Sequence, residues 1–295
     1  MIITKLRGGL GNQLFQYAAA RALALRHSTS LKFDRDWFDN RPVVDTARNY
    51  MLDCFAVEAE FATSREILQN RYAATGRNMH FFSPLVANFR NQEWGWYRER
   101  HFQFDPNFLK LGADTCLEGY WQSPLYFQDY SEQIRVETKI IKQLIGENAS
   151  LAELISVTRS VAVHIRRGDY VHGPETSRVH GSCPPSYYRQ AMSLLLEMFD
   201  NVHFFIFSDD QEWARANLDF DWPFVSFMDN GPENASEDLH LMALCHHHII
   251  ANSSFSWWGA WLSRYPDKIV IAPEKWFNDP SINTSDLIPS GWLRV

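Results

Sequence analysis

The second half of the chain alternates short apolar runs with longer segments of mixed character, and this alternation limits the possible folds more than any other feature. The apolar runs predict strands and the longer segments predict helices. Repeated strand–helix units indicate a parallel sheet with helices packed on its faces. The predicted strands are Val161–Ile165, His203–Phe207, His248–Ala251 and Lys268–Ala272, and the predicted helices are Pro185–Phe199, Gln211–Leu218, Ser236–His246 and Ser256–Tyr265.

The beginning of the chain follows the same plan. Met1–Leu6 is an apolar run that predicts a buried strand, and Leu14–His27 is rich in Ala and Leu, which predicts a helix. A second short strand is expected at Ser30–Asp34. The glycine-rich stretch Gly8–Gln13 lies between the first strand and the helix, where glycine permits positive φ and close approach of another molecule to the backbone.

The rest of the first half is less regular. Asp36–Trp121 is irregular and aromatic, whereas Ser123–Ile145 is predicted to be helical because its isoleucines fall broadly along one side. The polar stretch Gly146–Ser150 is the best candidate for a domain boundary. We therefore expect two Rossmann-like α/β domains, residues 1–150 and 151–295, facing each other across a cleft.

Composition excludes several classes of protein. The chain has 295 residues, 45% of them hydrophobic and 21% charged, which is typical of a globular protein. A net charge of −7 argues against general binding of nucleic acid, so an anionic substrate would need a local group of arginines. The four cysteines are widely spaced, which favours reduced thiols in a cytoplasmic protein. We expect neither a signal peptide nor a membrane-spanning helix.

The sharpest polar motif is VAVHIRRGDY, Val161–Tyr170. Strand alternation places His164 and Arg166 on the same face, and Arg166, Arg167 and Asp169 follow at the carboxyl end of the strand, where open α/β sheets bind ligands. A guanidinium grips phosphate with two parallel hydrogen bonds. The ordinary alternative is a surface Arg–Asp pair. We favour phosphate binding, chiefly by Arg166, with His164 orienting other groups rather than acting as a base.

The next strand ends in Ser208, Asp209 and Asp210. A carboxylate there could accept hydrogen bonds from a guanine base or ribose, or it could cap the following helix. The residues alone leave both possibilities open. A metal site is not favoured, because two adjacent aspartates do not form one.

The third strand runs into Asn252, Ser253, Ser254 and Phe255, where hydroxyl groups and a helix N-terminus would form a cradle for an anion. The tryptophans that follow are more often core residues at this spacing, although stacking on a ligand stays open for them. The preceding His246–His248 triplet is not expected to bind zinc, because consecutive side chains point in different directions.

The loop Gly8–Gln13 does not match two well-known nucleotide motifs. A P-loop would continue with Lys and Ser or Thr, whereas Leu14 follows here. The dinucleotide fingerprint GxGxxG also fails, since Leu14 stands where its third glycine belongs. A nicotinamide-dependent oxidoreductase therefore remains only an alternative, as does a non-catalytic carbohydrate- or nucleotide-binding protein. Gly11 is the residue of this loop that we expect to approach a ligand.

Taken in order, the motifs GGLGNQLFQYA, HIRRGDYV, FSDDQEWARANL and NSSFSWWGAWLS resemble the bacterial α-1,2-fucosyltransferases of glycosyltransferase family 11, from Gly8 to about Leu262. The resemblance implies a GT-B fold, GDP-fucose as donor, inversion at the anomeric carbon, and neither metal nor other cofactor. It also implies that Arg166 contacts the diphosphate and that Asn12 lies at the reacting centre. Phosphate and base would be held by Ser253, Ser254 and Phe255, and Asp238 falls in a matching segment.

The expected function is therefore transfer of L-fucose to the 2-hydroxyl of a β-linked, galactose-type acceptor in bacterial surface-glycan or O-antigen synthesis. A lipid-linked acceptor would bring the cytoplasmic protein into peripheral contact with the inner membrane. Asn12 is not a strong base, so the acceptor's proton must pass either to a carboxylate elsewhere or to the leaving phosphate. Both routes stay open.

Overall fold

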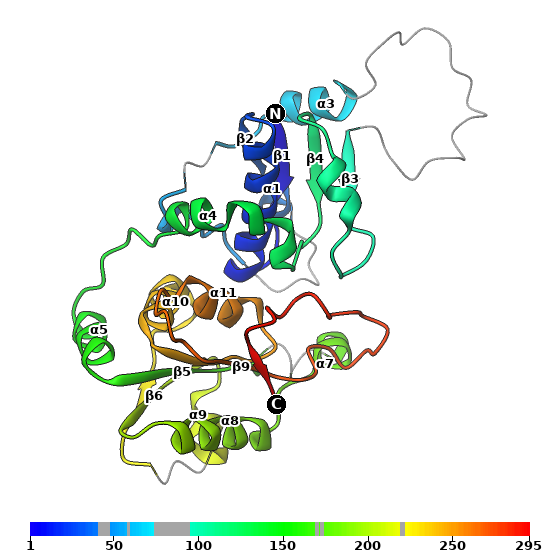
Figure 1. Cartoon of the computed structure of the whole chain (residues 1–295). Helices are drawn as coiled ribbons and strands as arrows, with labels where there is room; N and C mark the ends of the chain where they lie inside the picture. The colour runs from blue at the N-terminus through cyan, green and yellow to red at the C-terminus, as the bar shows by residue number, and fades with distance from the viewer. Residues whose placement is uncertain (41–47, 58–59, 74–94, 169–170, 172–173, 219–221) are drawn as a thin grey trace, which may run out of the picture. The chain divides into compact units, whose positions relative to one another are not determined.

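The computed structural model describes residues 1–40, 48–57, 60–73, 95–168, 171, 174–218 and 222–295 (Figure 1). The chain divides into two compact units, Met1–Thr138 and Lys139–Val295. Each is built around a parallel sheet. The predicted boundary after residue 150 falls within a helix, α5 (Glu147–Val157), whose Ile155 is buried in a core of the second unit. The polar residues predicted as the domain boundary are therefore the N-cap and first turn of that helix, in which Asn148 is buried.

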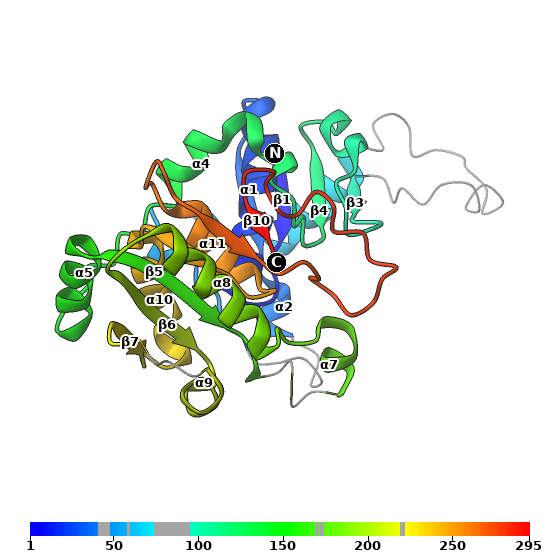
Figure 2. The same ribbon diagram turned by 60° about the horizontal axis from the view of Figure 1, so that its bottom comes forward.

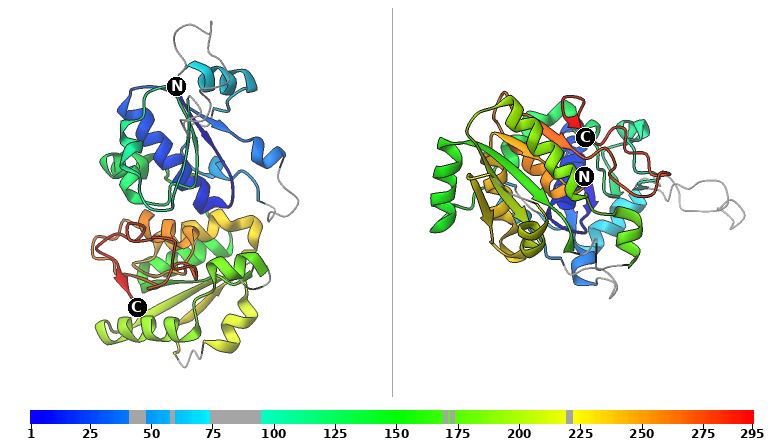
Figure 3. Two further views of the ribbon diagram at one scale, coloured as in Figure 1. Left: turned by 90° about the vertical axis from the view of Figure 1, so that its right-hand side faces the viewer. Right: turned by 90° about the horizontal axis from the view of Figure 1, so that it is seen from below.

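The first unit contains a four-stranded sheet of order β2–β1–β4–β3, in which every neighbouring pair is parallel. Helix α1 runs beside this sheet (Figure 3). The strands are β1 (Ile2–Lys5), β2 (Leu31–Asp34), β3 (Trp96–Arg98) and β4 (Thr115–Glu118), and the helices are α1 (Leu10–Arg26), α2 (Asp36–Asp39), α3 (Ser64–Ala73) and α4 (Ser131–Glu137), with 3₁₀ turns η1 (Leu52–Cys54), η3 (Pro106–Lys110), η4 (Pro124–Tyr126) and η5 (Gln128–Tyr130).

The predicted strand, helix and strand at the start of the chain are confirmed, with one change. Helix α1 begins four residues earlier than expected, so Gly11 and Asn12 lie in its first turn and not in a loop. Gly9 caps the helix with an extended backbone, and the turn before it is made by Gly8 at φ +78°. Only four residues, Leu6–Gly9, thus separate β1 from α1.

The prediction of one helix over Ser123–Ile145 is wrong. Ser123 and Pro124 start a short 3₁₀ turn, since the Ser123 hydroxyl accepts a hydrogen bond from the Leu125 N–H at 3.3 Å. The helical part is only α4, which ends where the buried Thr138 hydroxyl donates to the Ile134 carbonyl at 2.6 Å. Strands β3 and β4, only three and four residues long, also went unrecognised in the irregular aromatic region.

The second unit contains a six-stranded sheet of order β10–β9–β8–β5–β6–β7, again with every pair parallel. The four predicted strands and four predicted helices are confirmed, with ends that shift by up to three residues. Strands β7 and β10 and helices α5 and α7 were not predicted. The strands are β5 (Arg159–Ile165), β6 (Val202–Ser208), β7 (Val225–Met228), β8 (His247–Ile249), β9 (Val270–Ala272) and β10 (Leu293–Arg294), and the helices besides α5 are α7 (Pro174–His180), α8 (Pro185–Met198), α9 (Gln211–Asn217), α10 (Ala235–Leu244) and α11 (Ser254–Leu262), with a 3₁₀ turn η6 (Pro232–Asn234).

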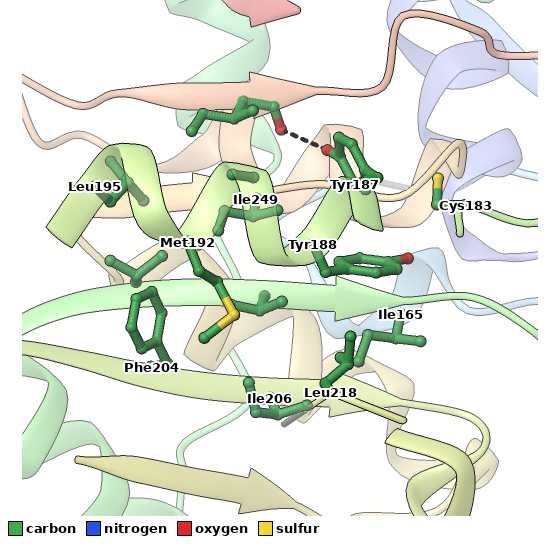
Figure 4. Close-up of a cluster of buried hydrophobic side chains, with 14 of the residues drawn as sticks. Ile165, Cys183, Tyr187, Tyr188, Met192, Leu195, Phe204, Ile206, Leu218 and Ile249 are labelled. Carbon is green, nitrogen blue, oxygen red and sulfur yellow. Dashed lines mark hydrogen bonds between the residues drawn. The ribbon is translucent and has the colours of Figure 1, made fainter. Parts of the chain in front are cut away.

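Helices cover both faces of this sheet, with α8 and α9 on one and α10 and α11 on the other (Figures 1 and 2). The expected alternation along β5 is confirmed: Val161, Val163 and Ile165 pack in the core beneath α8, which Figure 4 shows in close-up. Ala162 faces the opposite core, formed with Leu241 and Met242 of α10. Burial of apolar side chains on both faces stabilises the parallel sheet.

The register of the second sheet gathers one set of residues at its carboxyl edge. Ile165 pairs with Ser208 and Phe207 with Met228, so these three strands end together. The residues that follow these strands therefore lie at the same edge of the sheet. Arg166 follows β5 and Asp209 follows β6. Within the described ranges, no helix is both long enough and apolar enough to cross a membrane.

Candidate functional site

The carboxyl ends of β5 and β6 bring Arg166 beside Asp209. Arg166 Nη1 lies 2.9 Å from Asp209 Oδ2, and the side chains are 22% and 28% exposed. Asp209 Oδ1 also accepts a hydrogen bond from the Arg167 N–H at 2.8 Å. Glycine at position 168 permits this approach, because a Cβ there would lie 2.6 Å from Asp209 Oδ2. The Arg166 guanidinium is thus held at the sheet edge and remains partly open to solvent, where it could bind a phosphate.

Arg167 has a different set of contacts. Its Nε lies 3.2 Å from Asp210 Oδ2, and its guanidinium carbon is 3.9 Å from the centroid of the Trp213 ring. Asp210 Oδ1 caps α9 by accepting from the Trp213 N–H at 3.0 Å, while the Ser208 hydroxyl accepts from the Asp210 N–H at 3.0 Å. Asp210 is therefore the helix cap and Asp209 the counter-ion. Arg167 and Ser208 remain predicted donor ligands that also fix the start of α9.

His164 is buried on β5, with its ring centroid 5.6 Å from that of Phe255. Burial, with a smaller contribution from the charge of Arg166, lowers the pKa of His164 to about 3. The imidazole is therefore neutral at physiological pH, which suits the predicted orienting role. Its Nδ1 is buried and has no hydrogen-bond partner in the part of the chain that the structure describes. Asp169, another predicted ligand, lies outside the described residues.

The third predicted segment lies between β8 and α11. Ser253 is the N-cap of α11, and its hydroxyl accepts a hydrogen bond from the Phe255 N–H at 3.4 Å. Ser254 and Phe255 are the first two residues of the helix. The positive end of the helix dipole thus lies at the carboxyl edge of the sheet, where it would favour an anion. The structure brings these residues to the same edge as Arg166.

Asn252, predicted as a donor ligand, is engaged with the protein's own backbone. Its buried Nδ2 donates to the carbonyls of His180, Gly181 and Trp276 at 3.0, 3.2 and 3.1 Å, respectively. The Cys183 thiol lies 3.5 Å from its Oδ1. Asn252 therefore joins the loop before α8 and the segment after β9 to the end of β8. These contacts assign it a structural role, and direct donor binding remains a prediction.

The tryptophans of α11 belong to the core. Trp257 and Trp258 are fully buried and Trp261 is 6% exposed, and Trp257 Nε1 donates to the Leu287 carbonyl at 2.9 Å. The core alternative considered from the sequence thus applies to all three.

The three consecutive histidines also have structural contacts. His246 Nδ1 lies 3.1 Å from the Ser160 hydroxyl, His247 Nδ1 accepts from the Ile269 N–H at 3.1 Å, and His248 Nε2 lies 2.9 Å from the Met242 carbonyl. Among the described residues, no group of three or more His, Cys, Asp or Glu side chains could hold a metal ion.

Asp238 lies on α10, near the end of β7. Its Oδ1 accepts a hydrogen bond from Asn230 Nδ2 at 2.7 Å. Burial is the main cause that raises the pKa of Asp238 to about 7, and the nearby carboxylates of Glu237 and Asp229 contribute in the same direction. A carboxyl group with this pKa changes its charge near neutrality, which is a property often found at functional sites.

Gly11 and Asn12 belong to the first unit, in the first turn of α1. Asn12 Oδ1 accepts a hydrogen bond from Gln122 Nε2 at 2.9 Å. Gln122 follows β4, and β4 is the neighbour of β1 in the sheet, which explains how residues 110 positions apart in sequence meet. Asn12 therefore lies at the carboxyl edge of the first sheet.

Three residues near the predicted ligands were missed from the sequence. Gln122 contacts Asn12, Asn230 contacts Asp238, and Trp213 lies beneath Arg167. Asn230 could have been found as a polar residue just after an apolar run, but β7 was not recognised. Trp213 follows the Asp pair by three residues, a spacing at which a capping carboxylate reaches the backbone of the next turn.

Comparison with known proteins agrees with this architecture. The family model for glycosyl transferase family 11 matches residues 1–295. The chain is 34% identical over 302 residues to the alpha-1,2-colitosyltransferase of Escherichia coli, covering 100% of this chain and 99% of that protein. It is 31% identical over 316 residues to the O-antigen biosynthesis glycosyltransferase WbnK of Escherichia coli, covering 98% and 99%.

Two more distant similarities are to a protein from an animal and a protein from a plant. A galactoside alpha-(1,2)-fucosyltransferase 1 from Saimiri sciureus is 30% identical over 176 residues, which cover 57% of this chain and 46% of that protein. A mutant of FUT1 from Arabidopsis thaliana, solved in complex with GDP, matches 98% of this chain and 74% of its own with a TM-score of 0.52 and 13% identity. This structural likeness concerns the fold, and the expected α/β fold of the GT-B class is confirmed. Because the family model matches the whole chain, this protein belongs to glycosyl transferase family 11 and is a glycosyltransferase.

Proposed function

We propose that this glycosyltransferase transfers L-fucose from GDP-fucose to the 2-hydroxyl of a β-linked galactose unit, with inversion and without a metal or other cofactor. The observation that carries the proposal is the shared carboxyl edge of β5 and β8, where Arg166 and the N-terminus of α11 lie. A guanidinium and a helix N-terminus are the groups that a diphosphate needs when no metal neutralises it. Family membership directs this anion site toward a nucleotide sugar.

In the proposed reaction, the bond between the sugar's anomeric carbon and the β-phosphate oxygen breaks, and the acceptor oxygen bonds to that carbon. Negative charge develops on the departing GDP, which Arg166 stabilises. A donor of this kind typically contributes a factor of about 10²–10³ to turnover. His164 is neutral because its pKa is about 3, so it orients neighbouring groups and carries no proton to the leaving phosphate. Asn12 of the first unit donates a hydrogen bond at the reacting sugar. The acceptor's proton passes to a carboxylate or to the leaving phosphate.

A second donor is favoured by a specific observation. The chain is 34% identical, over its whole length, to an alpha-1,2-colitosyltransferase, and colitose is L-fucose without the 3-hydroxyl group. A site that hydrogen-bonds this hydroxyl would reject the deoxy sugar strongly, by about 10⁴–10⁵. A site that leaves it in solvent would accept both sugars. GDP-colitose is therefore the alternative donor, with the same linkage.

The acceptor is proposed from the same relatives. WbnK is named for O-antigen biosynthesis, and the animal relative is named for galactosides. We infer a galactose-containing repeat unit of a bacterial surface glycan as the acceptor. If it is lipid-linked, the protein works in peripheral contact with the inner membrane.

The test is release of GDP by the purified protein in EDTA. GDP-fucose and GDP-colitose are compared as donors, with lactose and a panel of β-galactosides as acceptors, and the linkage is read from the product. Acceptor-dependent release with an α-1,2 product supports the proposal, and the ratio of kcat/KM for the two donors decides which sugar is native. A protein that fails to bind GDP would contradict the donor class. Activity that EDTA abolishes and Mg²⁺ restores would contradict the metal-free mechanism.

A further inference from the structure

The side-chain amide of Asn12 is contacted from two sides within the first unit. Gln122 Nε2 donates to Asn12 Oδ1 at 2.9 Å, and Gln122 is only 8% exposed. On the other side lies Gly8, where an added Cβ would be 2.6 Å from Asn12 Nδ2. The Asn12 amide therefore has its oxygen directed to Gln122 and its nitrogen over Gly8. Glycine at position 8, with φ +78°, leaves room for that nitrogen.

Gln122 is itself held by a tightly packed turn after β4. The carboxylate of Glu99 accepts hydrogen bonds from the N–H groups of Tyr120 and Trp121 at 2.7 and 2.9 Å. Trp121 is fully buried and has φ +56°, a left-handed conformation that a bulky residue adopts only when its surroundings impose it. Gly119 fits because a Cβ there would lie 2.5 Å from the Glu99 Cβ. The turn thus holds the backbone that carries Gln122 in one conformation.

The chemistry of the pair determines how Asn12 is presented. Gln122 offers a donor to the Asn12 oxygen, so the oxygen is engaged and the NH₂ group is oriented by the same contact. A freely rotating amide could present either an acceptor or a donor to a substrate. Misplacement of a reacting or contacting group by about 1 Å can lower turnover by about 10²-fold. Loss of the contact that fixes the amide is therefore expected to lower turnover by a similar factor.

We propose that Gln122 is a positioning residue for the transferase reaction, which fixes the amide of Asn12 so that Asn12 presents its NH₂ group as a hydrogen-bond donor to the substrate. This inference rests on the proposed function, in which Asn12 contacts the reacting sugar. Glu99 supports the arrangement by holding the turn that carries Gln122. Gln122 itself touches neither substrate nor GDP in this assignment.

The experiment is a double-mutant cycle on the full-length protein. Gln122→Ala is expected to lower kcat by about 10- to 100-fold while KM for the GDP-sugar changes less than about threefold. Asn12→Ala is expected to lower kcat at least as much. The double variant should be no slower than Asn12→Ala alone, because Gln122 acts through Asn12. Gln133→Ala is the matched control, since Gln133 makes an exposed hydrogen bond to Glu137 on α4 of the same unit, and it should behave as wild type.

A second pair of measurements separates positioning from folding. Gln122→Glu replaces the donor by an acceptor, repels the Asn12 oxygen, and is expected to be as slow as Gln122→Ala although it keeps the size of the side chain. In ¹⁵N NMR spectra, the Asn12 NH₂ signals, assigned by their loss in Asn12→Ala, should shift and broaden in Gln122→Ala but not in Gln133→Ala. Equal melting temperatures for the variants would exclude unfolding as the cause.

The outcomes distinguish the inference from the proposed function. Losses in kcat that multiply in the double variant, unchanged Asn12 signals, or a Gln122→Glu variant of normal kcat would overturn the positioning role. Failure of the wild-type protein to turn over any GDP-sugar would count against the proposed function. In that case the NMR comparison alone decides whether Gln122 orders Asn12.

Discussion

The two sheets carry different chemistry at their carboxyl edges. In the first unit, the side-chain amides of Asn12 and Gln122 form a hydrogen bond at this edge. Arg7 stacks on the Tyr120 ring, with its guanidinium carbon 4.3 Å from the ring centroid. Among the described residues, no carboxylate forms an ion pair with Arg7. In the second unit, Arg166 pairs with Asp209 at the end of β5.

The difference follows from what each group costs to bury. Neutral amides can be buried at small cost when their hydrogen bonds are satisfied, so they suit a site that must fix one geometry. A guanidinium needs water or a counter-ion, which is why Arg166 and Asp209 both stay partly exposed. Under the proposed function, the first edge would orient the reacting sugar and the second would neutralise charge on the phosphates. The first two variants below test the two halves of this division, and the other two test which polar groups of the second unit serve its stability.

The largest effect is expected for Arg166→Lys. Lysine keeps the charge but loses the planar fork that binds two phosphate oxygens at once. We expect kcat/KM to fall by about 10²–10³, or about 2.7–4 kcal/mol, while the melting temperature stays near that of the wild type. Arg189→Lys is the control, since Arg189 makes an exposed contact to the Asn217 carbonyl. Turnover near the wild-type level would show that Arg166 is not needed for the reaction. It would also contradict charge neutralisation at the carboxyl edge of the second sheet.

Asn12→Ala tests the orienting role of the first edge. The loss of one preorganised donor is expected to reduce kcat by about 10²-fold. GDP affinity, measured by titration calorimetry without acceptor, should stay within about threefold of the wild-type value. Weaker GDP binding at unchanged kcat would instead make Asn12 a donor-binding residue, and the two edges would no longer differ in role.

Asn252→Ala asks whether an amide at the charged edge serves the fold. Its Nδ2 donates to three carbonyls, so its removal leaves buried acceptors without their partner. We expect the free energy of unfolding, measured in urea, to fall by about 1–3 kcal/mol. The remaining folded protein should keep most of its kcat at low temperature. A variant of wild-type stability but low activity would restore Asn252 as a donor ligand.

The smallest effect is expected for Asp238→Asn, as a change in pH dependence. The pKa of Asp238 is raised from 3.8 to about 7, so the folded state holds its proton more tightly than the unfolded state. Stability from this group is therefore fully present below about pH 4 and is lost as the pH rises to about 7.

Between pH 5 and pH 8 the unfolding free energy of the wild type should fall because of this group. Asp238→Asn should lose less over the same range. The exposed Asp267→Asn serves as control. Parallel curves for wild type and Asp238→Asn would show that this carboxyl group titrates alike in both states.

The sequence predicted β5 and β6 but missed β3, β4 and β7, and the length and composition of these strands explain the difference. β5 and β6 are seven residues long and buried on both faces, so they appear as apolar runs. β3, β4 and β7 are three or four residues long, and their composition does not separate them from loops. Tertiary pairing, and not local propensity, makes these segments strands.

The predicted ligands show the same division. Arg166 could be favoured over Arg167 from the sequence because strand alternation is a local property, and this choice stays a prediction. The contact between Asn12 and Gln122 could not be predicted, since it depends on β4 lying next to β1 across 110 residues of sequence. Local pattern identifies candidates, and long-range pairing decides which neighbours they have.

The pair formed by Arg166 and Asp209 has a consequence for ligand selection under the proposed function. The carboxylate of Asp209 already occupies one side of the guanidinium, so it acts as a tethered competitor for any incoming anion. A ligand with a single negative charge exchanges one such contact for another and gains little. A diphosphate brings several oxygens at once, which can engage Arg166 and the start of α11 together. The resting enzyme would thus discriminate against abundant simple anions before any sugar is recognised.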